Sequence, residues 1–257
     1  MHGLFGTKHL ILAAVSFILI GVLYYLTRKI RFEKICKYLL YVGIVSEIIK
    51  IFYYTIQNEA EYKGTLPRSD LPFHLCSIQI LLITIVCVVN NEKIKRFVLS
   101  FMMPSCLFGG IAAILIATHT ARNGMWIITL QYFGYHVAIS VFALHILLSK
   151  EFKLNIKDYF NALKFLLVMM FFAFYINSML YDGVSDINFM YVVSPPQKGL
   201  PFLNENHGWL VYIVHYAALV LFCVSIAYIK PIIDAIKEKI GRKKYVCEVM
   251  EKENAES

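Results

Sequence analysis

The sequence is poor in charged residues, and this scarcity excludes most soluble folds. Asp, Glu, Lys and Arg make up 16% of its 257 residues, whereas about 25% is usual in soluble domains. Hydrophobic residues make up 59%, and the mean hydropathy is +0.63. Apolar runs of about 20 residues recur along the chain, which is typical of a polytopic helical membrane protein.

Motifs that mark other common functions are also missing. There is no glycine-rich phosphate loop, no zinc-ligand spacing and no internal repeat, so we expect neither a metal nor a cofactor. The six cysteines show no paired spacing, which argues against a disulfide framework. The first apolar run lacks a basic leader and an Ala-x-Ala site, so we do not expect a cleaved signal peptide. Nothing points to nucleic acid or to an obligate protein partner.

Seven apolar runs are long enough to cross a hydrocarbon core of about 30 Å. They cover residues 9–27, 36–57, 71–90, 94–117, 126–148, 159–181 and 207–229. We therefore predict an all-α integral membrane protein, with a bundle of seven transmembrane helices in residues 1–230 and a charged cytoplasmic tail in 231–257 that lies on the membrane surface. One connection is long, 182–206, and loops of that length often form lids or parts of sites.

The net charge of +8 is explained by orientation in the membrane. Of the 25 Lys and Arg residues, nineteen fall on one side of the predicted bundle, five on the other, and Lys50 lies inside a span. Cytoplasmic loops carry the excess of Lys and Arg. We therefore expect a multi-pass protein of a cell membrane, such as the bacterial cytoplasmic membrane, with the N-terminus outside and the C-terminus inside. Residues 71–79 and the long loop then lie on the extracytoplasmic side.

Residues 71–79 bring reactive groups to the start of an apolar run. Pro72 suits the first position of a helix, which would place the thiol of Cys76 about one turn inside it. Polar groups at that depth are costly unless they are functional. Cys76 is the one cysteine close to the other polar groups of the outer half, although buried cysteine usually behaves as a small apolar residue.

Further polar groups fall in the same outer half when depth is counted at about 1.5 Å per residue. They are Glu47, Lys50, Gln79, Gln131, His136, Asn177 and His215. Such a gathering indicates one shared cavity. Simpler interpretations stay open: Glu47 and Lys50 can neutralise each other as i, i+3 neighbours, and His215 can form an interhelical hydrogen bond.

A thiol needs a nearby base or positive field to act as a nucleophile at neutral pH. His74 is two residues from Cys76, about 200° around a regular helix, and cannot easily face the same way. His136 is therefore the best-placed base. Lys50 or Gln79 could stabilise the oxyanion of an attacked carbonyl.

Three motifs resemble those of a known family. Residues 71–76, Leu-Pro-Phe-His-Leu-Cys, resemble the signature of the bacterial YwaF family of integral membrane proteins, which is related to animal transmembrane protein 164. Residues 131–136, Gln-Tyr-Phe-Gly-Tyr-His, match a span with an internal histidine. Residues 188–195 resemble the family's Asn-Tyr-x-Tyr-Leu…Lys-Pro loop, with Phe189 and Val192 in place of Tyr and Leu. The resemblance covers essentially the whole chain.

This resemblance implies transfer of a fatty acyl chain from a phospholipid to a lysophospholipid or similar lipid acceptor. It carries over Cys76 and His136 as the catalytic pair, and His74, Asn188 and Tyr191 as supporting members of the motifs. Membrane phospholipids would be donor and acceptor, and no cofactor is needed because exchange of one ester for another is nearly thermoneutral.

Two alternatives remain open at this stage. Water could resolve the acyl-enzyme, which would make the protein an intramembrane lipid ester hydrolase. The polar groups could instead bind a solute or relay protons in a non-catalytic transporter or ligand-binding protein. A transporter usually shows internal duplication or broken helices, and the sequence shows neither.

Overall fold

The computed structural model describes residues 5–56, 66, 68–118, 121–122, 124–149, 151–183, 187–197, 200, 203 and 208–256, without the side chains of 243–256. The regular elements among these residues are helical, apart from one isolated bridge between Leu200 and Leu203. The predicted all-α class is confirmed.

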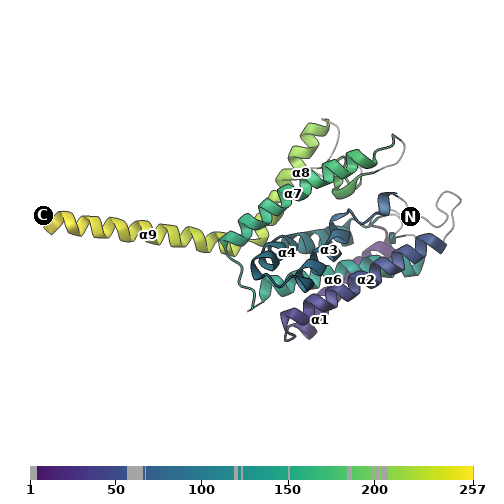
Figure 1. Ribbon diagram of the computed structural model, residues 1–257, viewed down its shortest axis with the longest axis horizontal. Helices are drawn as coiled ribbons and strands as arrows, with labels where there is room; N and C mark the ends of the chain where they lie inside the picture. Colours follow the sequence, from purple (N-terminus) through teal and green to yellow (C-terminus); the bar gives the residue numbers. More distant parts are fainter. Residues whose placement is uncertain are drawn as a thin grey trace.

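Figure 1 shows the order of the helices along the chain. They are α1 (Thr7–Thr27), α2 (Phe32–Ile56), η1 (Arg68–Asp70), α3 (Leu75–Val88), α4 (Glu92–Leu115), α6 (Trp126–Leu148), α7 (Ile156–Leu180), η2 (Phe189–Tyr191), α8 (Trp209–Ala227) and α9 (Ile229–Glu256). Helix α6 packs against α1, α2 and α4, while α3 lies between α2 and α4. Helices α7 and α8 lie side by side against α4, and α9 projects away from the bundle.

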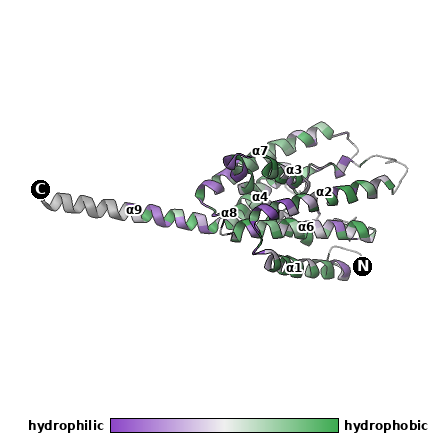
Figure 2. Ribbon diagram, turned by 60° about the horizontal axis from the view of Figure 1, so that its bottom comes forward, coloured by the Kyte–Doolittle hydropathy of each residue, from purple (hydrophilic) through white to green (hydrophobic). Residues whose placement is uncertain are grey.

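Five helices of the described chain are long and apolar enough to cross a membrane: α1, α4, α6, α7 and α8. Figure 2 shows hydrophobic residues along α1 and α6 and a mixture of hydrophilic and hydrophobic residues along α9. Large apolar side chains face outward on these helices, as in Ile18 with 64% exposure and Phe171 with 64%. The chain is therefore a helical membrane protein with several candidate spans.

The other two predicted spans are helices of a different kind. Helix α2 has 25 residues but carries charged side chains, including Glu47 and Lys50 within its second half. Helix α3 has 14 residues, which gives a length of about 21 Å, less than a hydrocarbon core of about 30 Å. Seven spans and the orientation of the bundle therefore stay predictions.

Helix α3 begins later than the sequence indicated. Phe73 donates its backbone N–H to the carbonyl of Leu71 (2.7 Å), which makes a three-residue turn centred on Pro72. The helix starts at Leu75, after an extended His74 (φ −69°, ψ 153°). The prediction that Pro72 opens the helix is wrong. Cys76 is consequently the second residue of α3 rather than a full turn inside it.

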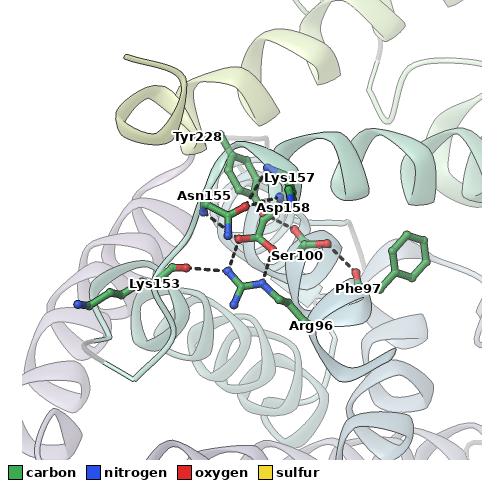
Figure 3. Close-up of polar contacts among 8 residues, drawn as sticks. All are labelled: Arg96, Phe97, Ser100, Lys153, Asn155, Lys157, Asp158 and Tyr228. Carbon is green, nitrogen blue, oxygen red and sulfur yellow. Dashed lines mark hydrogen bonds and ion pairs between the residues drawn. The ribbon is translucent and has the colours of Figure 1, made fainter. Parts of the chain in front are cut away.

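One ion pair joins α4 to α7. It lies at the end of the bundle where these two helices begin and where α8 ends, and this end is called the inner end below. Arg96 donates from Nε to Oδ1 of Asp158 and from Nη2 to Oδ2, and each of these two hydrogen bonds is 2.7 Å long (Figure 3). Arg96 also donates to the carbonyl of Lys153 (2.8 Å). Bidentate pairs of this kind fix geometry as well as adding energy, and the side chain of Asp158 is only 1% exposed.

The same carboxylate caps the start of α7. Asp158 accepts a hydrogen bond from the backbone of Asn155 (2.8 Å), while the Asn155 side chain accepts from the first turn of the helix, which completes a capping box. Beside it, the Tyr228 hydroxyl at the α8–α9 junction donates to the carbonyl of Ser100 on α4 (2.8 Å). These contacts hold the inner ends of α4, α7 and α8 together. The bonds of Asp158 with Arg96 and of Tyr228 with Ser100 are called the inner fastening below.

The inner fastening predicts the effect of Asp158→Asn. The change leaves the Arg96 guanidinium without its anion and weakens the cap of α7, so we expect the free energy of unfolding to fall by about 1–3 kcal/mol. Thermal unfolding of purified protein in detergent measures this as a lower Tm. The control is Glu33→Gln, which removes an exposed carboxylate that pairs with Lys37 and should leave the Tm almost unchanged. Equal Tm values for both variants would contradict the role of the pair.

The charge asymmetry predicts an orientation that labelling can check. With Cys76 and Cys247 both changed to Ser, a cysteine in the exposed position of Asp234 on α9 should resist a membrane-impermeant maleimide in intact cells and react after permeabilisation, because the rule places this end in the cytoplasm. Labelling in intact cells would reverse the topology and move the outer half of the chain to the cytoplasmic side.

Candidate functional site

A cavity of about 910 Å³ runs between the helices, and seven of the residues singled out in the sequence line it. They are Glu47, Lys50, His74, Cys76, Gln131, His136 and Tyr191. These residues come from α2, α3, α6 and the segments that precede α3 and follow α7. The structure therefore brings the thiol, two histidines and an ion pair into one enclosure.

Cys76 lies where a helix favours negative charge. It is the second residue of α3, and the N–H groups of a first helical turn have no partner inside the helix. These groups and the helix dipole stabilise a thiolate at this end. The Tyr135 hydroxyl donates to the carbonyl of Cys76 (2.8 Å), which holds this turn against α6. The Cys76 side chain is half-buried.

His136 is held in one tautomer. Its Nδ1 lies 2.7 Å from the carbonyl oxygen of Tyr132, and a carbonyl can only accept, so Nδ1 carries the proton and Nε2 presents a lone pair. His136 is 3% exposed, and its Nε2 has no hydrogen-bond partner among the residues that the structure describes. His136 and Cys76 thus line the same cavity without a hydrogen bond between them.

A charged cluster forms one polar part of the cavity lining. The Lys50 ammonium lies 2.8 Å from Oε2 of Glu47, as the i, i+3 spacing allows, and it also donates to the carbonyl of Asp70 (3.1 Å). Burial raises the pKa of Asp70 above its ordinary value, although the charge of Lys50 opposes the shift. Lys50 is only 12% exposed, so its charge acts in a poorly hydrated setting.

The segment after α7 is fastened to α8 in a strained conformation. Met190 and Tyr191 both have positive φ (56° and 54°), which is uncommon for residues other than glycine. Tyr216 donates to the carbonyl of Met190 (2.7 Å), and Tyr212 donates to that of Tyr191. Strain of this kind persists where neighbours over-determine the backbone. Here it holds Tyr191 in the lining of the cavity.

Tyr191 can act as a donor in that position. Burial raises the pKa of Tyr191 to about 12, so its phenol stays protonated at neutral pH. Its ring lies 5.7 Å from the ring of His74. His74 precedes α3 and has extended backbone, so the helical-wheel reason for separating it from Cys76 does not apply. His74 and His136 both line the cavity.

Asn188 shapes the loop and does not line the cavity. Its Nδ2 donates to the carbonyl and hydroxyl of Ser194 (2.7 and 2.9 Å), and its Oδ1 accepts from the backbone of Val193 (3.1 Å). Asn177 of α7 pairs with both the N–H and the carbonyl of Phe189 (2.8 and 3.0 Å). The two amides are therefore structural: one folds the loop and the other attaches it to α7.

Two candidates from the sequence lie elsewhere. Gln79 donates to the carbonyl of Leu75 and to Ser105 (3.0 and 3.1 Å) and accepts from the thiol of Cys106 (3.2 Å). Its amide is thus used to join α3 to α4, which corrects the expectation that it stabilises an oxyanion. His215 is exposed on α8 and does not line the cavity, so its placement in the shared site was wrong.

Sequence reasoning missed Tyr135 and Asp70. Tyr135 directly precedes His136, and Asp70 directly precedes the Leu71-Pro72 motif. The signal for each was a polar side chain next to a motif, with no role assigned to it. Among the described residues, no group of three or more His, Cys, Asp or Glu side chains is arranged to hold a metal ion.

One comparison with known proteins gives a match. The family model described as "TMEM164 family" matches residues 4–228, which include all seven cavity-lining candidates and end at the α8–α9 junction. No curated protein and no solved structure matches the chain.

The contrast between two neighbouring cysteines predicts a labelling pattern. Cys106 is fully buried and donates to Gln79, whereas Cys76 is half-buried at the cavity. N-ethylmaleimide should therefore modify Cys76 in the folded protein and Cys106 only after unfolding, as peptide mass spectrometry can show. His136→Ala should slow modification of Cys76 several-fold, because the lone pair that accepts the proton is lost. Equal rates at the two cysteines would refute this assignment.

Proposed function

The chain belongs to the TMEM164 family, and from this premise we propose that it is a membrane-embedded acyltransferase. A fatty acyl chain passes from a phospholipid to a lysophospholipid or similar lipid acceptor through a thioester on Cys76. One observation carries the proposal: a half-buried thiol and a histidine with an unpartnered Nε2 line the same cavity of a helical membrane protein.

The first half of the reaction forms the acyl-enzyme. His136 Nε2 takes the proton of Cys76, and the thiolate attacks the ester carbonyl of the donor phospholipid. The bond between Sγ and the carbonyl carbon forms, the ester C–O bond breaks, and the lysophospholipid oxygen leaves with the proton from the imidazolium.

The second half reverses these roles with a different alcohol. The hydroxyl of the acceptor lysolipid gives its proton to Nε2 and attacks the thioester carbonyl. The C–S bond breaks, and the leaving thiolate regains the proton from His136. The net reaction exchanges one ester for another, so no oxidant, reductant or energy source is consumed.

Two groups support the charge that develops on the carbonyl oxygen. The N–H groups in the first turn of α3, which have no partner inside the helix, lie beside the nucleophile, and Lys50 supplies a positive charge in the same cavity. Donors that are already in place before the reaction stabilise an oxyanion most effectively. The neutral phenol of Tyr191 can orient the donor or acceptor.

The remainder of the lining favours a lipid over a soluble substrate. Apolar residues of α4, α7 and α8 form most of it, including Phe108, Leu166 and Val220. Such walls exclude water from a thioester, which favours transfer over hydrolysis. With the predicted orientation, lipid enters from the extracytoplasmic leaflet.

The proposal predicts a coupled loss of activity. Cys76→Ser and His136→Ala should each reduce acyl transfer by about 100-fold or more, and the double variant should be little worse than either, because the two side chains act as one unit. The assay follows a labelled diacyl phospholipid and an unlabelled lysophospholipid, and it quantifies new diacyl product and free fatty acid.

Matched controls test whether these losses are specific. Cys87→Ser changes a thiol on the same helix, and His215→Ala changes an exposed imidazole; both should retain activity. Free fatty acid as the sole product would identify a hydrolase. Full activity in Cys76→Ser would end the covalent-cysteine mechanism, and inactivity on every lipid would favour a binding or transport function.

A further inference from the structure

We propose that the inner part of the cavity is an acyl channel, closed at its inner end, that limits the length of the transferred chain, with Phe101, Ala162 and Val224 as its floor. This inference rests on the proposed function, because it assigns the channel to the acyl group that Cys76 carries. It goes further in naming the helices that bind the chain and the residues that set its length.

The channel begins at the level of the nucleophile. Helix α3 packs closely on α4 there: a Cβ added to Gly109 would lie 3.3 Å from Cδ2 of Leu75, the residue before Cys76. Phe101 also lines the cavity and lies eight residues farther along α4 toward the inner end, which is about 12 Å. The cavity therefore extends well below the thiol.

Helices α7 and α8 reach the same depth from the opposite side. Ala162 lies 18 residues from Leu180 at the outer end of α7, about 27 Å, and it lines the cavity. Val224 lies 15 residues from Trp209 at the outer end of α8, about 22 Å, and lines it too. Three helices thus contribute floor residues at the inner end of the cavity.

The floor is tightly packed. Phe101 is 2% exposed and stacks on Phe165 with ring centroids 4.4 Å apart. Ala162 is 1% exposed and Val224 is 6% exposed. The short side chain of Ala162 leaves room that a larger residue would fill. Chain length would then depend on side-chain volume at these positions.

The inner fastening explains why the channel ends there. Asp158 lies one turn beyond Ala162 on α7, and Tyr228 lies one turn beyond Val224. Asp158 binds Arg96, and Tyr228 binds the carbonyl of Ser100, the residue before Phe101. These bonds hold the three helices together immediately below the floor, so a longer chain has no further space between them.

An acyl chain is the occupant that the lining fits. Between the level of Cys76 and the floor, the walls include Pro104, Phe108, Leu166 and Val220, which offer apolar contact. A polar solute would lose its hydration there without compensation. A chain joined to Cys76 as a thioester has its carbonyl at the polar end and its methyl end near the floor.

The test compares chain-length profiles of matched variants. Val224→Phe places a ring in the floor, so transfer of the longest saturated chains should fall by about tenfold or more relative to short chains. Phe101→Leu removes volume from the floor and should extend the accepted length. Val214→Phe makes the same substitution at a lipid-facing position of α8 that is 58% exposed, and its profile should match the unaltered protein. An unchanged profile in both Val224→Phe and Phe101→Leu would overturn the channel.

A second measurement locates the bound acyl chain by photo-crosslinking and does not require turnover. Vesicles of phosphatidylglycerol doped with a phospholipid that carries a diazirine near its acyl terminus are mixed with the protein and irradiated. Crosslinks should fall on peptides of α7 and α8 around Leu166 and Val220, and they should weaken in Val224→Phe. Crosslinks restricted to outward-facing residues would refute the channel. Failure of the proposed function is seen separately, as absence of transfer by the unaltered protein.

Discussion

The bidentate pair between Arg96 and Asp158 is the interaction on which the shape of the molecule depends. Helices α7 and α8 bury little of their surface within the chain, so apolar packing alone positions them weakly. A charged pair costs desolvation energy, but Arg96 is 40% exposed, so its guanidinium keeps part of its hydration. The pair therefore fixes the position of α7 relative to α4 without the full desolvation cost of a buried charge. The wall of the cavity that α7 contributes is positioned by this ion pair.

The cavity in turn contains a group that the fold leaves unsatisfied. An unpartnered buried polar atom usually costs about 1–3 kcal/mol, and Nε2 of His136 is one. The bond from Nδ1 to the Tyr132 carbonyl prevents the ring from escaping this cost by changing tautomer. Among the described residues this lone pair has no partner, which costs stability, and the strained backbone at Met190 and Tyr191 is a second such cost beside the same cavity.

How far the sequence predicts this arrangement depends on the range of each interaction. Hydrophobic runs predict seven spans, and five of them correspond to helices of the described chain that are long and apolar enough to cross a membrane, because burial in lipid is a local, additive property of a segment. The gathering of Cys76, His136 and Lys50 followed from depth along helices of known rise. Gln79 and His215 were misplaced because depth says nothing about the direction in which a side chain points. The start of α3 was missed because a three-residue turn around Pro72 competed with the helix-opening role of proline. The bonds of Asn188 depend on loop geometry that apolar periodicity does not encode.

The shortness of α3 has a consequence for how the bilayer meets the protein. Were α3 to cross the bilayer, as the sequence predicts, a helix of about 21 Å would leave about 9 Å of a hydrocarbon core to irregular backbone. Lipid tails offer no hydrogen bonds to such backbone, so it must be shielded by protein or wetted. The turn that leads to Cys76 is shielded in this way: His74 lies against Phe189 and Tyr191, with ring centroids 5.0 and 5.7 Å apart. Phe189 and Tyr191 therefore take the place of solvent beside this turn, and their removal would expose its peptide groups to lipid.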